Sequence, residues 1–450
     1  MAFVTRTLAG RRDLLAPAAS YPERYAAFLA SAVTGTPQAR FDILFAVGAE
    51  SLTLSADGTT RNEQGDAQAG TFLEALDAAW SAHHRPRVED GLPFHGGWVV
   101  YLAYELAGQI EPSLSLSLPA SIGIAPVALA LRAPAAAIVD HVEQRTVLVA
   151  EEGAEAWLDV LAADLDAAEP EAVLPLPLAV EEDEPARFLD GVRRVQDHLH
   201  AGDVFQVNLS RRWTAHFADA PAPASLMRAL RAANPAPFAG LLQQPGWAIV
   251  SSSPERLVEA RDGVVQTRPI AGTRPRAAGD DDAARMRELI SHPKERAEHV
   301  MLIDLERNDL GRVCVPGSVG VDEFMVVESY AHVHHIVSNV RGRACEGVTP
   351  GQIIAATFPG GTITGCPKVR CMEIIGALEQ EPRGAYTGAL GYLDDNGDMD
   401  LNILIRTLAV EGARVSLRAG AGIVTDSVPE RELEETRAKA RGLLRVFGLA

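Results

Sequence analysis

Hydrophobic residues recur along this chain with the two spacings that distinguish strands from helices. A period of two puts every second side chain on one face of a strand, and a period of three to four builds one stripe of a helix. After Pro185, which suits a first helical position, Phe188 and Val192 begin a stripe that Val195 and Leu199 continue, so we predict a helix there. Runs bounded by turn residues predict strands at 41–46, 96–101, 136–139, 202–210, 249–257 and 264–273.

The pattern breaks at residues 168–185, where composition changes. This stretch contains a Leu-Pro-Leu-Pro-Leu sequence followed by four acidic residues. Prolines disfavour regular helix and a run of like charges stays in water, so we expect a linker. It separates an N-terminal half, residues 1–167, from a C-terminal half, residues 186–450. Motifs typical of catalytic or binding sites are sparse in the N-terminal half, which we interpret as a scaffold.

Two expected helices of the C-terminal half have similar start signals, and each carries a pair of glutamates three residues apart. The first begins at Pro293, after a serine and a histidine, and should run to about residue 306. Glu295 and Glu298, three residues apart, lie on one face of it. The opposite, buried side is expected to consist of Val300, Leu302, Ile303 and Leu305.

The second helix begins around Pro429. Ser427 and Glu430 are spaced as a capping box, and Glu432 and Glu435 repeat the pair of glutamates three residues apart. A single pair of this kind is usually a solvated face. Two such pairs on helices with apolar faces, with no His or Cys at matching positions, suit a hard cation, and we predict Mg²⁺. A di-iron site would need Glu-x-x-His, which neither helix has.

Charge limits the classes of partner. The formal net charge of -19 and a pI near 5.1 argue against nucleic acid or an anionic membrane surface. The hydrophobic fraction of 47% and the charged fraction of 22% are those of a folded globular chain. An anionic substrate would therefore be attracted locally, by a metal or an arginine pocket.

Cysteine usage and the N-terminus favour a cytoplasmic location. The four cysteines form no CxxC and have no nearby histidine spacing that suits zinc. The first residues lack the apolar run of a signal peptide. The most apolar stretch, residues 120–131, is too short to span a bilayer.

Several polar groups fall at the ends of expected strands. Glu255 follows one strand, Gly272 ends another and Arg406 could clamp a carboxylate near the end of a third. His335 lies in a strand-like pattern, where it could serve as an acid or base or be an ordinary core histidine. The glycine-dense loop at residues 358–368 does not match the pattern of a nucleotide phosphate loop.

Taken together, these stretches resemble the chorismate-utilising enzymes over nearly the whole chain, most specifically from about residue 185 to 449. Within that family the resemblance is closest to aminodeoxychorismate synthase component I, and anthranilate synthase component I is close to it. The matching motifs are Ser253–Arg256, Arg268–Thr273, Lys294–Glu298, Arg307–Asp309, His334–Ser338, Phe358–Lys368, Ile405–Thr407 and Gly420–Ser427.

The resemblance implies an α+β fold of two large antiparallel β-sheets packed face to face with peripheral helices, built from both halves. It places the ligands of Mg²⁺ at Glu298 and Glu435, with Glu295 and Glu432 around them holding water. The ring carboxylate of chorismate would complete the metal shell. Its enolpyruvyl carboxylate would meet Arg406, Tyr392 and the backbone near Gly422.

The resemblance also implies the catalytic groups: Glu255 as the acid at the leaving C4 hydroxyl, with His335 and Gln206. An amide at position 206 replaces the lysine base of relatives that use water, which argues for ammonia as the nucleophile. The remaining residues expected to line the substrate are Ala271, Gly272, Thr273, Gly361, Thr362 and Lys439.

The product stays open between two outcomes. Many aminodeoxychorismate synthases carry a lysine where this chain has Ala271, and without its amine no covalent adduct forms there. We favour 4-amino-4-deoxychorismate, for p-aminobenzoate and folate synthesis, over anthranilate. A non-catalytic chorismate-binding subunit is a remote third hypothesis. No cysteine lies in a Gly-x-Cys-x-Gly elbow, so we expect ammonia to come from a separate glutamine amidotransferase subunit.

Overall fold

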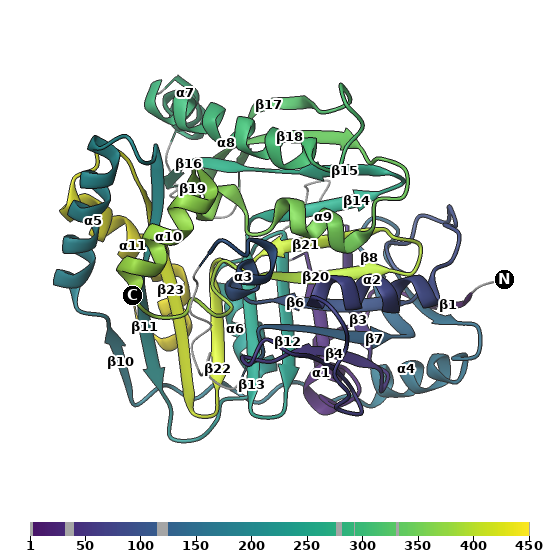
Figure 1. The fold of residues 1–450 in the computed structure, drawn as a ribbon. Coiled ribbons are helices and arrows are strands. Elements are labelled where there is room, and N and C mark those ends of the chain that lie inside the picture. The colour runs from purple at the N-terminus through teal and green to yellow at the C-terminus, as the bar shows by residue number, and fades with distance from the viewer. Residues whose placement is uncertain are drawn as a thin grey trace.

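The computed structural model describes residues 3–31, 40–114, 125–275, 281–291, 293–329 and 333–449. Two antiparallel sheets dominate it (Figure 1). Sheet A contains, in order, β1 (Phe3–Ala9), β9 (Arg145–Glu151), β8 (Ala135–Asp140), β3 (Phe41–Ala46), β2 (Ala27–Ala30), β12 (Phe238–Gln244), β13 (Trp247–Ser253), β22 (Thr407–Glu411), β23 (Arg414–Ile423), β11 (Gln206–His216) and β10 (Ala179–Glu182), with β19 (Gly365–Cys366) beside β11.

Sheet B lies against sheet A and also mixes strands from early and late in the chain. It contains, in order, β16 (Ile270–Pro275), β18 (Val333–Arg343), β15 (Val264–Thr267), β14 (Arg256–Arg261), β21 (Met399–Ile403), β20 (Ala389–Asp394), β6 (Gly97–Leu102), β7 (Ala128–Ala133), β4 (Ser51–Leu54) and β5 (Thr60–Asn62), with β17 (Gly320–Ser329) beside β18.

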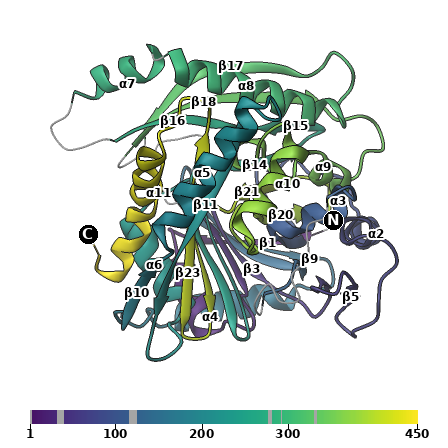
Figure 2. The same cartoon turned by 60° about the vertical axis from the view of Figure 1, so that its left-hand side comes forward.

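Helices lie outside the two sheets. Figure 2 shows α5 and α11 along the part of sheet A that holds β11 and β23, with α8 above them beside sheet B. The helices are α1 (Leu15–Ser20), α2 (Phe72–His83), α3 (Ala107–Ile110), α4 (Ala156–Ala167), α5 (Pro185–His200), α6 (Pro223–Ala233), α7 (Asp282–Ser291), α8 (Pro293–Gly311), α9 (Pro350–Thr357), α10 (Lys368–Glu379) and α11 (Pro429–Leu444), with short 3₁₀ turns η1 (Tyr104–Leu106), η2 (Gly361–Ile363) and η3 (Arg445–Phe447).

The alternation of apolar residues determines which faces meet. One buried cluster fills the space between the sheets, where Phe45 and Ile138 of sheet A meet Val99 and Leu129 of sheet B. A second cluster lies under α1, α4 and α6 on the other face of sheet A. The predicted fold, two antiparallel sheets packed face to face with peripheral helices, is confirmed.

The expected linker is not wholly irregular. Residues 179–182 form β10, which pairs with β11 at the edge of sheet A. Its two glutamates stay exposed, as a charged run should, and charges on an edge strand discourage pairing with another chain. Each sheet takes strands from both sides of residues 168–185.

Three details of the acidic helices differ from expectation. Val300 is 43% exposed instead of buried, because it lies on the same side as the solvent-facing residues of α8. The helix continues past residue 306 to Gly311, since Asp309 and Leu310 are buried. The capping box at Ser427 does not form, because its hydroxyl accepts from the backbone N–H of Val424 at 3.1 Å and α11 is capped at Val428.

None of the helices in the described ranges combines the length and the apolar character needed to cross a bilayer.

Candidate active site

Glu255 lies where the chain passes from sheet A to sheet B, between β13 and β14. Its carbonyl oxygen accepts from the backbone N–H of Ile403 at 3.0 Å, and its Oε1 accepts from the N–H of Ile270 at 3.4 Å. The residue is 4% exposed. Burial raises the pKa of Glu255 to about 7, against smaller lowering effects of the Thr362 hydroxyl, the Ile270 amide and Lys439. Such a carboxyl can hold a proton near neutral pH and donate it.

His335 lies on β18 opposite a bulge of β16. The register of β16 shifts between Ala271 and Thr273, and Gly272 has a φ of +61°, which favours glycine. His335 Nδ1 lies 3.3 Å from the Gly272 carbonyl oxygen. Burial, helped by Arg406, lowers the pKa of His335 to about 4, so the imidazole is neutral at pH 7 and can accept a proton. The backbone of Thr273 pairs with His335, and its side chain lies outside the described residues.

Gln206 and Asn208 point from one face of β11 toward the glycines of β23. A Cβ on Gly422 would lie 2.5 Å from Gln206 Nε2, and one on Gly420 would lie 2.7 Å from Asn208 Oδ1. The two amides therefore occupy the space that side chains of β23 would fill. They are 7% and 8% exposed, and neither amide oxygen has a hydrogen-bond partner among the described residues. Buried acceptors of this kind are rare unless a ligand or water satisfies them.

Arg406 connects β21 and β22 and approaches the same end of β23. It has a φ of +54°, a strained conformation for a residue with a side chain. Its Nη1 donates to the Lys439 carbonyl oxygen at 2.8 Å, and Lys439 Nζ donates to the Gly420 carbonyl oxygen at 2.9 Å. Burial lowers the pKa of Arg406, while Tyr386 and Glu435 oppose that effect. A fixed guanidinium at this end of β23 is suited to a carboxylate.

Tyr386, which the sequence analysis did not select, lies at this site. A Cβ on Gly420 would lie 2.8 Å from its hydroxyl oxygen. Burial raises the pKa of Tyr386 to about 12, so it remains a neutral hydrogen-bond donor. Its position twenty residues before Arg406 gives no local signal in the sequence.

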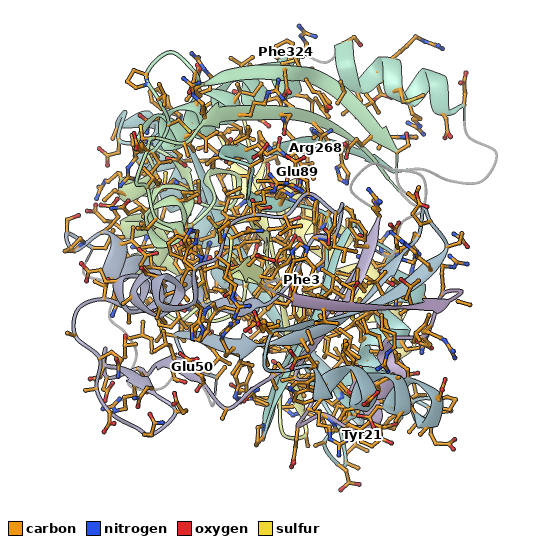
Figure 3. All side chains as sticks on the ribbon, turned by 90° about the vertical axis from the view of Figure 1, so that its right-hand side faces the viewer. Phe3, Tyr21, Glu50, Glu89, Arg268 and Phe324 are labelled. Atoms are coloured by element: carbon orange, nitrogen blue, oxygen red, sulfur yellow. The ribbon has the colours of Figure 1, made fainter. Side chains whose placement is uncertain are left out.

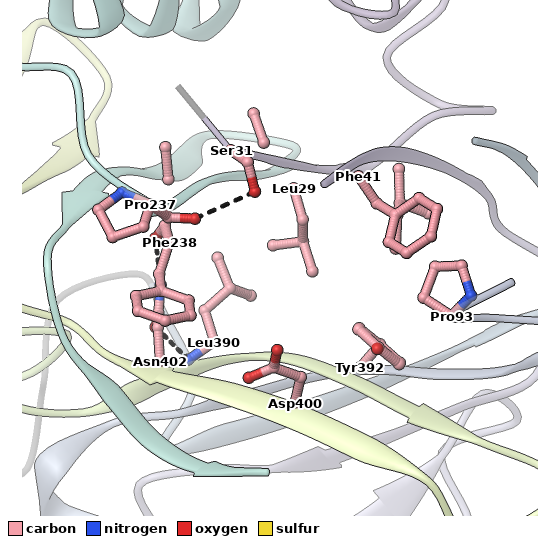
Figure 4. A pocket seen from close by; sticks show the side chains of 13 residues that line it. Leu29, Ser31, Phe41, Pro93, Pro237, Phe238, Leu390, Tyr392, Asp400 and Asn402 are labelled. Carbon is pink, nitrogen blue, oxygen red and sulfur yellow. Dashed lines mark hydrogen bonds between the residues drawn. The ribbon is translucent and has the colours of Figure 1, made fainter. Parts of the chain in front are cut away.

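Tyr392 lies elsewhere, which corrects the sequence-based placement beside Arg406. It lines a cavity of about 90 Å³ between the sheets, together with Asp400 and Asn402 (Figure 4). The side chains of β20 alternate between faces, so Tyr392 packs against Phe45 and Phe94 in the core between the sheets.

The loop at residues 358–368 forms a wall behind Glu255. Gly361 and Thr362 lie in η2, and the Thr364 hydroxyl donates to the Gly360 carbonyl oxygen at 2.9 Å. A Cβ on Gly361 would lie 2.3 Å from Leu305 Cδ2, so the glycine permits close approach of the loop to α8. This loop and α8 are thereby held together next to the acid.

The four predicted metal-binding glutamates come from two helices. Glu295 reaches the β16 bulge, since a Cβ on Gly272 would lie 2.7 Å from its Oε2. Glu435 Oε1 contacts Lys439 Nζ at 2.7 Å, and its side chain is 48% exposed. Glu298 is partly exposed and Glu432 is 9% exposed.

The donor chemistry of these residues is oxygen alone, as Mg²⁺ prefers. Within the described ranges, no three His, Cys, Asp or Glu side chains are grouped closely enough to hold a metal. Mg²⁺ is commonly held by one or two carboxylates with water and substrate completing its shell. The residues therefore fit an ion that the substrate shares, and they do not form a cage of protein ligands.

Not every motif residue belongs to this cluster. Arg268, labelled in Figure 3 below the strand that carries Phe324, forms ion pairs with Glu323 and Glu328 at 2.6 Å each. Its positive charge is therefore paired with carboxylates of β17 within sheet B.

Comparison with known proteins decides the family. The model of the chorismate binding enzyme family matches residues 26–445. This chain belongs to that family. It is therefore an enzyme that acts on chorismate, and its site residues can be compared with named relatives.

These relatives carry two different names. Aminodeoxychorismate synthase component 1 of Bacillus subtilis is 39% identical over 413 residues, covering 88% of this chain and 86% of its own. Anthranilate synthase component 1 of Thermus thermophilus is 41% identical over 447 residues, covering 94% and 92%. The crystal structure of anthranilate synthase component I from Streptococcus pneumoniae matches with a TM-score of 0.81 and 32% identity, covering 91% of this chain and 93% of that one.

Proposed function

We propose that this protein aminates chorismate with ammonia to give 4-amino-4-deoxychorismate, for p-aminobenzoate and folate synthesis. The observation that carries ammonia as the nucleophile is the pair of buried amide oxygens of Gln206 and Asn208, which have no partner among the described residues. Ammonia has three N–H donors and needs acceptors in a buried site. No lysine stands at position 206 to activate water.

The substrate would lie between the end of β23 and the two acidic helices. Arg406, the Tyr386 hydroxyl and the backbone at Gly422 would bind the enolpyruvyl carboxylate. Gly361, Thr362, Ala271 and Gly272 would line the ring, and Lys439 would stay paired with Glu435 at the rim. This arrangement would put the C4 hydroxyl toward Glu255.

Mg²⁺ would be held by Glu298 and Glu435, with Glu295 and Glu432 binding its water. When bound, it supplies the positive charge that holds the ring carboxylate and balances the acidic helices. The remaining steps belong to residues of the chain.

The proton transfers balance around Glu255. Its carboxyl gives a proton to the C4 hydroxyl as the C4–O bond breaks and water leaves. Ammonia forms the new C4–N bond, and the resulting ammonium group gives up a proton that restores Glu255 or is accepted by neutral His335. Gln206 and Asn208 would orient ammonia before attack.

A specific observation favours a second candidate, anthranilate synthesis. Position 271 holds alanine in the strand bulge beside His335, so no lysine amine is available there to form an adduct at C2. Ammonia could then add at C2 as the C4–O bond breaks and water leaves with the proton of Glu255. Loss of the C2 proton and of the enolpyruvyl group as pyruvate would then give anthranilate.

A glutamine amidotransferase subunit is the proposed source of ammonia. The relatives are named as component 1 or component I, which implies a second component.

Product identification tests the proposal. The protein is incubated with chorismate, ammonium and Mg²⁺, with and without an aminodeoxychorismate lyase, and products are separated and identified by mass and fluorescence. We expect p-aminobenzoate only when the lyase is present. Fluorescent anthranilate formed without the lyase would establish the second candidate, and no loss of chorismate would contradict both.

A further inference from the structure

Arg383, a buried residue that the proposed reaction does not use, lies in the connection between α10 and β20. It is 4% exposed. Its Nε and Nη2 donate to the two carboxylate oxygens of Glu379 at 3.0 and 2.8 Å. Nη1 donates to the Ile363 carbonyl oxygen at 3.1 Å and to the Thr387 hydroxyl at 3.3 Å, and Nη2 also donates to the Asn208 carbonyl oxygen at 2.8 Å. A guanidinium has five N–H groups, so each of them has a partner.

Two of these acceptors belong to different walls of the site. Ile363 lies in η2, within the loop that forms the wall behind Glu255. Asn208 lies on β11, and its side-chain amide points toward the glycines of β23. One planar group therefore joins the wall next to the acid to the strand that carries the amides proposed to orient ammonia.

The same residue also holds Tyr386. The carbonyl oxygen of Arg383 accepts from the backbone N–H of Tyr386 at 3.1 Å, which closes a turn of four residues. The guanidinium lies over the Tyr386 ring, 5.5 Å from its centroid, and over the Tyr104 ring at 4.8 Å. Because Tyr386 is a proposed donor to the enolpyruvyl carboxylate, Arg383 contacts a third part of the substrate site.

Arg383 is itself fixed by further contacts. Its backbone N–H donates to Glu105 Oε1 at 2.7 Å. Its partner Glu379 also accepts from the N–H and the hydroxyl of Ser210, at 2.9 and 2.8 Å, and from Arg418 Nη2 at 3.1 Å. A guanidinium held in this way has little freedom to move, as the placement of several neighbours requires.

We propose that Arg383 is a positioning residue for chorismate: its guanidinium sets the spacing between η2, β11 and the ring of Tyr386. This rests on the proposed sites for chorismate and ammonia. All five N–H groups are bonded within the protein, so Arg383 acts through these neighbours and not by touching the substrate. Arginine suits the task because its planar fork reaches acceptors in several directions, whereas the three donors of a lysine come from one atom.

The test is Arg383→Lys, which keeps a positive charge beside Glu379 and cannot bridge both carbonyl oxygens. Initial rates of chorismate loss are measured with Mg²⁺ and saturating ammonium. We expect KM for chorismate to rise about tenfold, the equivalent of one hydrogen bond to its carboxylate. We expect kcat/KM to fall about 100-fold, the effect of a displacement of about 1 Å in the site.

KM separates this role from a merely structural one. A variant that only folds less well has fewer active molecules, which lowers the apparent kcat but leaves KM unchanged. An unchanged KM for chorismate in Arg383→Lys would therefore overturn the proposal. Glu379→Asp is the second variant if Arg383→Lys does not fold, because it keeps every charge and should draw the guanidinium toward α10. KM should rise in it too, and an unchanged value there would likewise overturn the proposal.

Arg132→Lys is the matched control, because Arg132 is also 4% exposed and has partners of the same kinds. It pairs with Glu151 at 2.6 Å and with Asp395 at 3.0 Å. It donates to the Gly97 carbonyl oxygen at 2.6 Å and lies 5.7 Å from the centroid of the Trp98 ring. None of these partners is a residue proposed to bind chorismate, ammonia or Mg²⁺. KM should stay at the wild-type value in this control, and an equal rise would overturn the proposal.

The wild type distinguishes failure of this inference from failure of the proposed function. If the wild type consumes no chorismate, both fail. If it consumes chorismate and the Arg383 variant has the same KM, the positioning role alone fails. Loss of chorismate is followed whichever product forms, so the choice of product does not affect the result.

Discussion

Along α8, Glu295 and Glu298 in the first turns are partly exposed, whereas Glu306 and Asp309 near the end are 5% and 2% exposed. All four are acids on one continuous helix. Carboxylates in contact with water can stay charged and attract a cation, whereas burial favours the protonated form. The difference teaches that burial, more than residue type, decides which acids along one helix can bind a metal ion and which favour the protonated form.

The largest expected effect is at the exposed end. Glu298→Ala or Glu435→Ala should reduce turnover of chorismate roughly 10³-fold or more, because each removes charge that holds the ion on the substrate. Activity is measured over a titration of Mg²⁺, and folding by thermal melting. Glu434→Ala is the control, since Glu434 is exposed on α11 and pairs with Arg437. Turnover that persists in both variants would contradict the metal assignment.

The acid itself should give the next effect. Glu255→Gln should lower kcat on the order of 10²-fold, toward the lower end for acid–base groups, because an amide can still donate a hydrogen bond to the leaving hydroxyl. The alkaline limb of the pH profile near 7 should disappear, since the group that loses its proton is gone. Kinetics with saturating ammonium measure both quantities. If the alkaline limb remained in this variant, the pKa that it reports would belong to another group.

Glu379 shows that a buried carboxyl can also have a lowered pKa, in contrast to Glu306. Glu379 on α10 is buried like Glu306, but it accepts hydrogen bonds from Arg383 and Arg418, and these two cations lower its pKa despite burial. Glu379→Gln should destabilise the fold by about 3–5 kcal/mol, because two buried arginines lose their partner. Urea unfolding measures the change, with exposed Glu373→Gln on the same helix as control. A loss below 1 kcal/mol would mean that Glu379 is protonated.

The family resemblance, carried by motifs spread along the chain, predicted the fold, and local patterns predicted individual helices and strands. Short runs bounded by turn residues predicted β3, β6 and β8, and the start signal at Pro293 located α8. The resemblance selected Glu255, His335, Gln206 and Arg406, which the structure brings to one end of the sheets. Their roles remain proposals.

What the sequence could not predict depends on which side chains meet across the fold. Tyr386 and Tyr392 both precede Arg406, and only the pairing of β20 within sheet B reveals that Tyr392 faces the core. Glu306 was treated as the end of a helix, because its burial depends on η2 and β15 packing onto α8. The edge strand β10 was missed because its two glutamates are typical of a solvated loop.

The smallest expected effect is on stability, and its sign separates a protonated Glu306 from a charged one. A glutamate with a pKa of 4.5 in the unfolded chain and about 8 in the fold binds more protons when folded between those values. The free energy of unfolding therefore falls as pH rises from 4.5 to 8, by up to about 1.4 kcal/mol per pH unit for each such group. Other buried acids titrate in this window too, so the comparison with a variant isolates Glu306.

In Glu306→Gln this contribution is absent, so the decline of stability between pH 5 and 8 should be shallower than in the wild type. Urea midpoints measured at intervals of half a pH unit give the two slopes, and Asp304→Asn should follow the wild type, because Asp304 is exposed on the same helix and pairs with Arg307. Between pH 5 and pH 8 the free energy of unfolding of the variant should fall by less than that of the wild type, because an amide does not ionise. Equal slopes would mean that Glu306 is ionised in the fold at pH 5, and the two ends of α8 would then differ in exposure but not in charge.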